Sequence, residues 1–144
     1  MTIRIREVDL GVSRETLERL DAAIFPDGPP VDLEGRRWWI AYTGAGEPVA
    51  FGGLRAIGGA LYLSRAGVLS AWRRLGLHSR LIRVRLRAAR KLAAGRPMGV
   101  YTYTAIGNVA SANALERCGF RYWRARAPWW DDGDDGFVYW RRFV

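Results

Sequence analysis

The chain has 144 residues, 49% of them hydrophobic, and a formal net charge of +9. It is long enough for one domain with a buried core and too short for two, and one cysteine with one histidine excludes an internal disulfide and disfavours a structural metal site. No run of eighteen apolar residues occurs and the N-terminus alternates in character, so we expect no membrane span, no secretion signal and a cytoplasmic protein.

The N-terminal third predicts a strand, a helix and a hairpin. Residues 3–6 alternate isoleucine with arginine, as a half-exposed strand does. Ser13 is expected to cap a helix whose apolar face carries Leu17, Leu20 and Ile24. Residues 25–30 end this helix, because two prolines after a glycine cannot continue it. Residues 38–42 and 49–54 then read as two strands joined by a turn at 44–46.

The central stretch predicts a strand, a tight basic loop and a helix. Residues 61–68 have strand composition, and Gly76 stands where the backbone must turn closely. From Leu77 the apolar period is helical, with one stripe formed by Leu77, Leu81, Val84, Ala88 and Leu92, and a basic side formed by Arg80, Arg83, Arg87, Arg90 and Lys91. The first amides of such a helix have no intrahelical partners, so the loop with Arg73 and Arg74 is predicted to bind an anion.

The charge distribution agrees with an anionic ligand. No Asp or Glu occurs between Glu47 and Glu116, whereas this interval contains eleven Arg and Lys residues. We therefore expect a positive field over the middle of the fold. Such a field suits a small polyanion or nucleic acid, and it is also compatible with a solvated helix face.

The C-terminal part predicts a strand, a short helix and two more strands. Residues 100–104 form the strand, Asn108 begins the helix, Gly119 ends it and Phe120 begins the next strand. The last two strands flank an acidic connection at residues 131–136. This connection lacks the ligand pattern of a calcium loop, and taken alone it is interpreted as a solvated turn.

Two motifs resemble those of one enzyme family. The segment Arg73-Arg74-Leu75-Gly76-Leu77-His78 resembles the Q/R-x-x-G-x-G/A signature with which the GNAT superfamily of N-acetyltransferases binds the pyrophosphate of acetyl-CoA. His78 departs from that signature, since the family usually has Gly or Ala there. Residues 108–120 resemble the second hallmark, N-x-x-[AS]-x-x-x-x-E-K-x-G-F, at the expected distance. The resemblance is strong over residues 48–123.

The resemblance implies a single GNAT-like α/β domain over residues 1–144, with a mixed, largely antiparallel sheet flanked by helices. It implies transfer of an acetyl group from acetyl-CoA to an amine of a small molecule or peptide. It also implies that the acidic connection at residues 131–136 lies beside that amine, where its carboxylates would attract a cationic acceptor. The choice between a monomer and a homodimer stays open. The residues implied to bind acetyl-CoA are Val68, Arg73, Arg74, Leu75, Gly76, Leu77, His78, Ser79, Asn108, Ser111 and Asn113.

Acetyl transfer also needs a donor for the oxyanion and a proton for the leaving thiolate. The resemblance implies a backbone N–H near Val68 as the oxyanion donor. Many relatives carry a tyrosine as the acid at the position of Leu115, so the usual acid is absent here. Tyr103 and Ser111 are the candidate catalytic residues that replace it, and Tyr101 is a further candidate on the same strand.

The general base is open between Glu34, Asp27 and a chain of water molecules. His78 is disfavoured as a base because the resemblance places it beside the phosphates, although its ordinary pKa is near neutral. Cys118 is expected to pack in the core rather than act as a nucleophile. Two other functions also remain open: a GNAT-fold protein that binds or acts on nucleic acid, and an acyl-CoA sensor without turnover.

Overall fold

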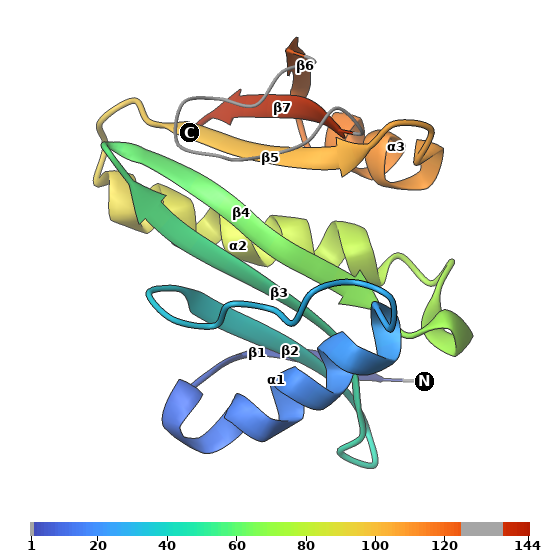
Figure 1. Cartoon of the computed structure of the whole chain (residues 1–144). Coiled ribbons are helices and arrows are strands. Elements are labelled where there is room, and N and C mark those ends of the chain that lie inside the picture. Colours follow the sequence, from blue (N-terminus) through green and yellow to red (C-terminus); the bar gives the residue numbers. More distant parts are fainter. Residues whose placement is uncertain (1, 125–136) are drawn as a thin grey trace.

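In the computed structural model, which describes residues 2–124 and 137–144, seven strands form one sheet in the order β1-β2-β3-β4-β5-β7-β6 (Figure 1). The strands are β1 (Ile3–Val8), β2 (Arg37–Thr43), β3 (Pro48–Ile57), β4 (Ala60–Val68), β5 (Gly99–Ala105), β6 (Arg121–Arg124) and β7 (Phe137–Phe143). The helices are α1 (Leu10–Ile24), α2 (Leu77–Ala93) and α3 (Val109–Arg117), with a short 3-10 turn, η1 (Ser70–Trp72), before α2. Only β4 and β5 pair in parallel, which confirms the predicted mixed, largely antiparallel α/β domain.

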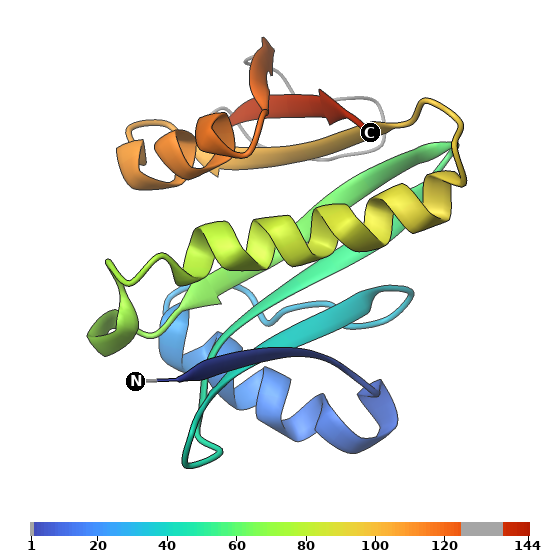
Figure 2. The same ribbon diagram turned by 180° about the vertical axis from the view of Figure 1, so that it is seen from behind.

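The helices cover opposite faces of the sheet because side chains alternate along the strands. In β2, Trp38 and Ile40 pack in one cluster with Leu17 of α1, whereas Trp39 and Ala41 belong to a larger cluster that includes the buried residues of α2 and α3. Figure 1 shows α1 in front of the sheet, and Figure 2 brings α2 to the front. Across the described helices, none is long and apolar enough to span a membrane.

Helix α1 begins before the position that its sequence suggested. Its N-cap is Asp9, whose Oδ1 accepts a hydrogen bond from the backbone N of Gly11 at 3.0 Å. The prediction that Ser13 is the cap is therefore wrong, because Asp9 already satisfies an amide of the first turn and the helix continues through Ser13. The predicted apolar face is confirmed, since Leu17 and Leu20 are buried.

Helix α2 begins at Leu77 as predicted, but its buried face differs from the predicted stripe. Leu92 is 43% exposed and Val84 is only half-buried. The sheet covers a wide arc of the helix, and the buried set consists of Leu77, Ser79, Leu81, Ile82, Arg85, Leu86, Ala88, Ala89 and Ala93. The five basic residues predicted for the other side are exposed. One arginine, Arg85, therefore lies in the buried face, where the sequence analysis expected none.

The sheet opens between β4 and β5. These strands pair at two positions only, Leu61 with Val100 and Tyr62 with Tyr101. The hydroxyl of Thr102 then donates a hydrogen bond to the carbonyl oxygen of Leu63 at 3.2 Å, and beyond it the two strands diverge (Figure 1). Both strands continue past the last pair, to Val68 and to Ala105, and their separated ends form the walls of a cavity.

A β-bulge in β4 lies beside this opening. Gly52 of β3 is opposite Ala66 and Gly53 is opposite Ser64, so Arg65 is an additional residue on β4. A bulge bends its strand and changes the direction of neighbouring side chains. The bulge therefore brings Ser64, Arg65 and Ala66 together along one side of the opening, where all three line the cavity.

Candidate active site

A cavity of about 450 Å³ lies at the N-terminal end of α2 and is called here the α2 cavity. Its walls come from the end of β4, the loop before α2, the first turn of α2 and α3. Nine of the residues predicted to bind acetyl-CoA line it: Val68, Arg73, Arg74, Gly76, Leu77, His78, Ser79, Asn108 and Ser111. The other two, Leu75 and Asn113, are exposed and lie outside its lining.

The loop before α2 turns its backbone toward this cavity. Gly76, the N-cap of α2, has a φ of 76°, and Arg74 has a φ of 66°, so two left-handed residues flank Leu75. Gly76 adopts this conformation without penalty, whereas Arg74 is strained. Alternating backbone of this kind groups N–H donors into an anion-binding concavity. The loop is tied to β4, because Arg73 Nε donates a hydrogen bond to the carbonyl oxygen of Val68 at 3.2 Å.

The first turn of α2 adds further donors. No side chain caps the helix, and its first backbone bond runs from the N of Arg80 to the carbonyl oxygen of Gly76 at 3.1 Å. The amides of Leu77, His78 and Ser79 precede that bond at the positive end of the helix dipole. This donor set fits phosphate groups, which α-helix N-termini bind through their free amides.

The end of β4 offers another backbone donor. The N of Leu69 donates to the carbonyl oxygen of Val49, which makes Ala50 and Val68 a non-hydrogen-bonded pair in the ladder. The N–H of Val68 is therefore directed away from β3, to the side where β5 has separated from β4. This is the direction required of the predicted oxyanion donor.

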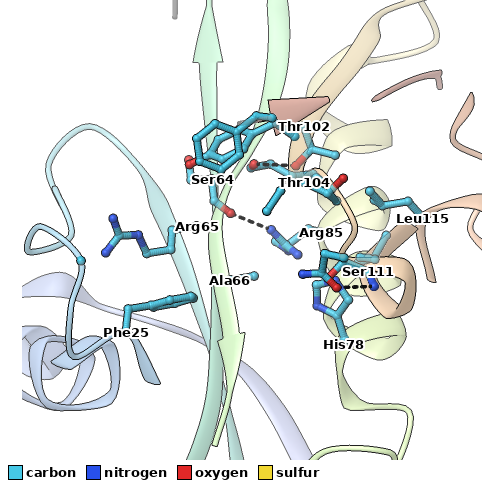
Figure 3. Close-up of a pocket in the computed structure, with 17 residues that line it drawn as sticks. Phe25, Ser64, Arg65, Ala66, His78, Arg85, Thr102, Thr104, Ser111 and Leu115 are labelled. Atoms are coloured by element: carbon cyan, nitrogen blue, oxygen red, sulfur yellow. Dashed lines mark hydrogen bonds between the residues drawn. The ribbon is translucent and has the colours of Figure 1, made fainter. Parts of the chain in front are cut away.

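A second cavity of about 290 Å³ lies between the diverging ends of β4 and β5 and is called here the interstrand cavity (Figure 3). It lies next to the α2 cavity, since the two share the lining residues Phe25, Ala66, His78, Asn108 and Ser111. Within the described part of the chain, its lining contains arginine, histidine and hydroxyl side chains but neither Asp nor Glu.

Arg85 of α2 is the charged group buried deepest in the interstrand cavity. It is 2% exposed, and within the described part of the chain it donates hydrogen bonds to three carbonyl oxygens: from Nε to Leu81 at 3.0 Å, and from Nη1 to Gly53 at 3.0 Å and to Ser64 at 3.2 Å. Figure 3 shows it reaching from α2 toward β4. Burial lowers the pKa of Arg85 to about 10, so the guanidinium stays charged at neutral pH.

Two small residues complete the surroundings of Arg85. A Cβ at Gly52 would lie 3.0 Å from its Cζ, so the glycine makes room for the guanidinium. Within the described part of the chain, the buried hydroxyl oxygen of Ser64, a residue 8% exposed, has no hydrogen-bond partner, and it lines the same cavity. Neither Arg85 nor Ser64 was predicted from the sequence as a residue of the site. The available signal was the position of Arg85, four residues after Leu81 and within the apolar arc of α2.

His78 lies where the two cavities meet. Burial, and to a smaller extent the charge of Arg85, lower the pKa of His78 to about 4. The imidazole is therefore neutral at pH 7, and it holds a proton too weakly for general-base catalysis near neutral pH. This agrees with the argument from sequence against a basic role.

The structure brings the two predicted catalytic residues to the interstrand cavity. Tyr103 lines it, with its ring packed 4.8 Å from that of Phe137. Ser111 lines both cavities, and its backbone N donates to Asn108 Oδ1, the N-cap of α3, at 3.2 Å. Tyr101 lies outside the lining, where its ring packs 4.7 Å from that of Trp123.

Leu115 also contributes to the site as a wall of the interstrand cavity (Figure 3). An apolar side chain therefore occupies the position at which the resemblance implied a tyrosine. Cys118 is buried in the core near Ser79, with 3.9 Å from its Sγ to the Ser79 carbonyl oxygen, which confirms its predicted packing role.

The predicted base candidates lie outside both cavities. Glu34 pairs with Arg14 at 2.5 Å on the surface, and Asp27 is an exposed loop residue. The carboxylate of Asp21, a residue 4% exposed, pairs with Arg65 of the cavity lining at 2.7 Å and thereby neutralises it. The acidic connection, with its proposed role toward a cationic acceptor, lies outside the described residues.

The Asp21–Arg65 pair holds the loop after α1 against β4. Asp21 Oδ2 accepts a hydrogen bond from the backbone N of Val31 at 3.0 Å, and Arg65 donates to the carbonyl oxygen of Pro29 at 2.9 Å. The guanidinium of Arg65 also lies 5.2 Å from the ring of Phe25. These contacts fix Phe25 in the lining of both cavities.

Comparison with known proteins gives one family and one fold. Residues 8–120 match the family model described as the acetyltransferase (GNAT) family. No curated protein sequence is significantly similar to the chain. A Bacillus subtilis acetyltransferase in complex with CoA has 18% sequence identity and a TM-score of 0.76, with 99% of each chain covered. A GNAT-family acetyltransferase from Staphylococcus aureus Mu50 has 16% identity and a TM-score of 0.74 over 99% of each chain.

The ribosomal-protein-S18-alanine N-acetyltransferase from Escherichia coli has 14% identity and a TM-score of 0.74, over 99% of this chain and 94% of the other. At these identities the similarity establishes the fold, and the acceptor of that enzyme is a property of that enzyme.

Proposed function

Because the chain belongs to the acetyltransferase (GNAT) family, we propose that it transfers the acetyl group of acetyl-CoA to an amine of a small molecule or a peptide. One observation carries this proposal. The α2 cavity, which is rich in backbone donors and basic residues, lies next to a cavity that opens between two strands of the sheet, and the two share five lining residues. A ligand with a polyphosphate at one end and a reactive group at the other fits such a pair of adjacent cavities.

The residues divide into groups with distinct tasks. The amides of Leu77 to Ser79, together with Arg73 and Arg74, would hold the phosphates of acetyl-CoA. Acetyl-CoA supplies an activated acetyl group as a thioester. The N–H of Val68 would donate a hydrogen bond to the carbonyl oxygen of that group, where negative charge develops. Tyr103 and Ser111 stay proposed as groups that handle protons.

The loop after α1 would form part of the acceptor side. It brings Phe25 and Gly28 to the interstrand cavity, across from Tyr103 on β5. This wall is largely apolar and uncharged, because Arg65 is already paired with Asp21. A neutral amine, which is the form able to attack a thioester, is less costly to bring there than an ammonium ion. A location in the cytoplasm, expected from the sequence, stays a prediction.

Two measurements test the proposed function. Acetyl-CoA at about one hundred times its dissociation constant should stabilise the fold by about 2.7 kcal/mol, which calorimetry or thermal melting detects. A screen of amines that follows release of free thiol then identifies the acceptor. Absence of any stabilisation at millimolar acetyl-CoA would exclude the proposal. Binding without thiol release from any amine would favour the acyl-CoA sensor, and salt-dependent binding of DNA or RNA would favour the nucleic-acid function.

A further inference from the structure

We propose that the buried guanidinium of Arg85 stabilises the negative charge that develops on the sulfur of CoA when the acetyl group leaves. The inference rests on the proposed function and adds a specific role to it. Its basis is a positive charge enclosed in the interstrand cavity without a carboxylate partner in the described part of the chain. Burying such a charge is costly, and three carbonyl dipoles offset that cost only in part.

The reaction produces a negative charge on sulfur, which could pair with the positive charge of Arg85. As the amine nitrogen bonds to the acetyl carbon, the carbon–sulfur bond breaks, the sulfur keeps the bonding electron pair as a thiolate, and the proton of the amine passes to water. A tyrosine at the position of Leu115 would neutralise the thiolate with a proton, but leucine has no proton to give. A fixed cation in a site of low dielectric constant can stabilise the thiolate without a proton transfer.

Among the basic groups that line the described cavity, Arg85 is the one that is charged and has no described carboxylate partner. The titratable lining groups of the cavity are Arg65 on β4, His78 and Arg85 on α2, and Tyr103 on β5. Arg65 is neutralised by Asp21, and His78 is uncharged at pH 7 because burial lowers its pKa to about 4. The hydroxyl of Ser64, which has no partner among the described residues, belongs to the residue whose carbonyl oxygen Arg85 contacts, and it is available as a neutral donor to the same anion.

The competing explanation is purely structural. Arg85 donates to the carbonyl oxygens of Gly53 and Ser64, the pair that borders the bulge, and so it also fastens β3 to β4. Loss of activity in a variant of Arg85 would fit either explanation. The test must therefore measure the charge on sulfur directly, with no acceptor and no turnover.

The parent protein alone provides the first measurement. Binding of CoA is compared with binding of desulfo-CoA, which lacks the thiol, by calorimetry over a pH series that crosses the pKa of the free thiol. A cation beside the thiolate should lower the pKa of the bound thiol by about 1 to 3. CoA should then gain at least about tenfold in affinity relative to desulfo-CoA as the pH rises through this range. Thiolate absorbance of bound CoA in the ultraviolet checks the ionisation independently.

Variants of Arg85 test whether this gain in affinity for CoA comes from its guanidinium. Arg85→Met keeps most of the bulk without the charge and should abolish the gain, whereas Arg85→Lys keeps a cation and should retain part of it. The matched control is Arg87→Met, which removes an exposed charge two residues further along the same helix and should leave the gain unchanged.

The experiment distinguishes a failure of the role proposed for Arg85 from a failure of the proposed function. If the parent binds CoA and desulfo-CoA equally at every pH, or if Arg85→Met retains the full gain, the role of Arg85 is refuted while the proposed function stands. If neither ligand binds the parent, the proposed function itself fails. Should Arg85→Met not fold, the parent and Arg85→Lys series still decide, because a smaller gain in Arg85→Lys than in the parent supports the proposal, whereas an equal gain in both or no gain in the parent overturns it.

Discussion

The two adjacent cavities are both positive, but they carry their charge in different surroundings. In the α2 cavity the charge belongs to Arg73, Arg74 and Arg117, which are exposed, and to the dipoles of backbone amides. In the interstrand cavity it belongs to Arg85, which is enclosed by β3, β4 and α2. Water and salt weaken the first kind of charge and hardly reach the second. We infer that one cavity attracts and holds a polyanion, whereas the other acts on a reacting atom.

Substitution of Gly76 tests the α2 cavity with the largest expected effect. Gly76 has a φ of 76°, and a β-branched residue is strained in this conformation. In Gly76→Val the loop is expected to shift, so that its amides no longer converge and affinity for acetyl-CoA falls by at least about 100-fold, which corresponds to about 2.7 kcal/mol. Calorimetric titration measures this loss.

The control for Gly76 lies at the other end of the same helix. Gly95 has a φ of 83°, and a Cβ there would also meet no atom within 4 Å. Gly95→Val therefore carries a similar strain far from both cavities, and it should lose stability with no change in affinity. Equal losses of affinity in the two variants would show that strain in α2, rather than the phosphate loop, controls binding.

His78 provides a second test of the comparison, because it lines both cavities and the buried charge of Arg85 contributes to its lowered pKa. Its pKa is about 4 in the folded protein and about 6.5 when unfolded, so the unfolded chain binds the additional proton within that window. Stability should accordingly fall as the pH falls. Relative to His78→Gln, the parent should lose about 2 kcal/mol of unfolding free energy between pH 7 and pH 5. Denaturant unfolding at both pH values gives the difference, and parallel pH profiles would contradict it.

The sequence predicted the α2 cavity far better than the interstrand cavity. Gly76 and Asn108 occupy local positions, a helix start and a helix cap, whose requirements can be read from neighbouring residues. Arg85 and Ser64 acquire their roles from the bulge at Arg65 and from the separation of β4 and β5. Those features depend on how distant strands pair, which residue patterns along one strand do not encode.

The backbone strain at Arg74 permits a further test, in which the expected changes in stability and affinity are smaller. Arg74 is one of two non-glycine residues with positive φ in the described chain, and it lines the α2 cavity. Arg74→Gly should relieve the strain and raise stability by about 1 kcal/mol, while affinity for acetyl-CoA falls several-fold because a charge is lost. Thermal melting and titration measure the two effects.

Ala94 provides the matching substitution for Arg74. It is the other non-glycine residue with positive φ, at 52°, and it caps the C-terminal end of α2. Ala94→Gly should stabilise the protein similarly without a change in affinity. If Arg74→Gly gains stability and keeps its full affinity, Arg74 has no part in ligand binding and its strain has no functional explanation.

A change of salt concentration distinguishes the exposed charges from the buried one most directly, although the expected change in affinity is the smallest. The exposed arginines of the α2 cavity act through water, where the Debye length shortens from about 10 Å at 0.1 M salt to about 3 Å at 1 M. Affinity for acetyl-CoA should therefore fall several-fold over this range, and the fall should be weaker in Arg74→Gly. The pKa of the bound CoA thiol should change little, because Arg85 is enclosed by protein and mobile ions do not screen it. Titrations of CoA and desulfo-CoA at both salt concentrations measure the two quantities in one experiment. If the advantage of CoA over desulfo-CoA at high pH disappears as salt rises, its source is an exposed charge, and the distinction between the cavities does not hold.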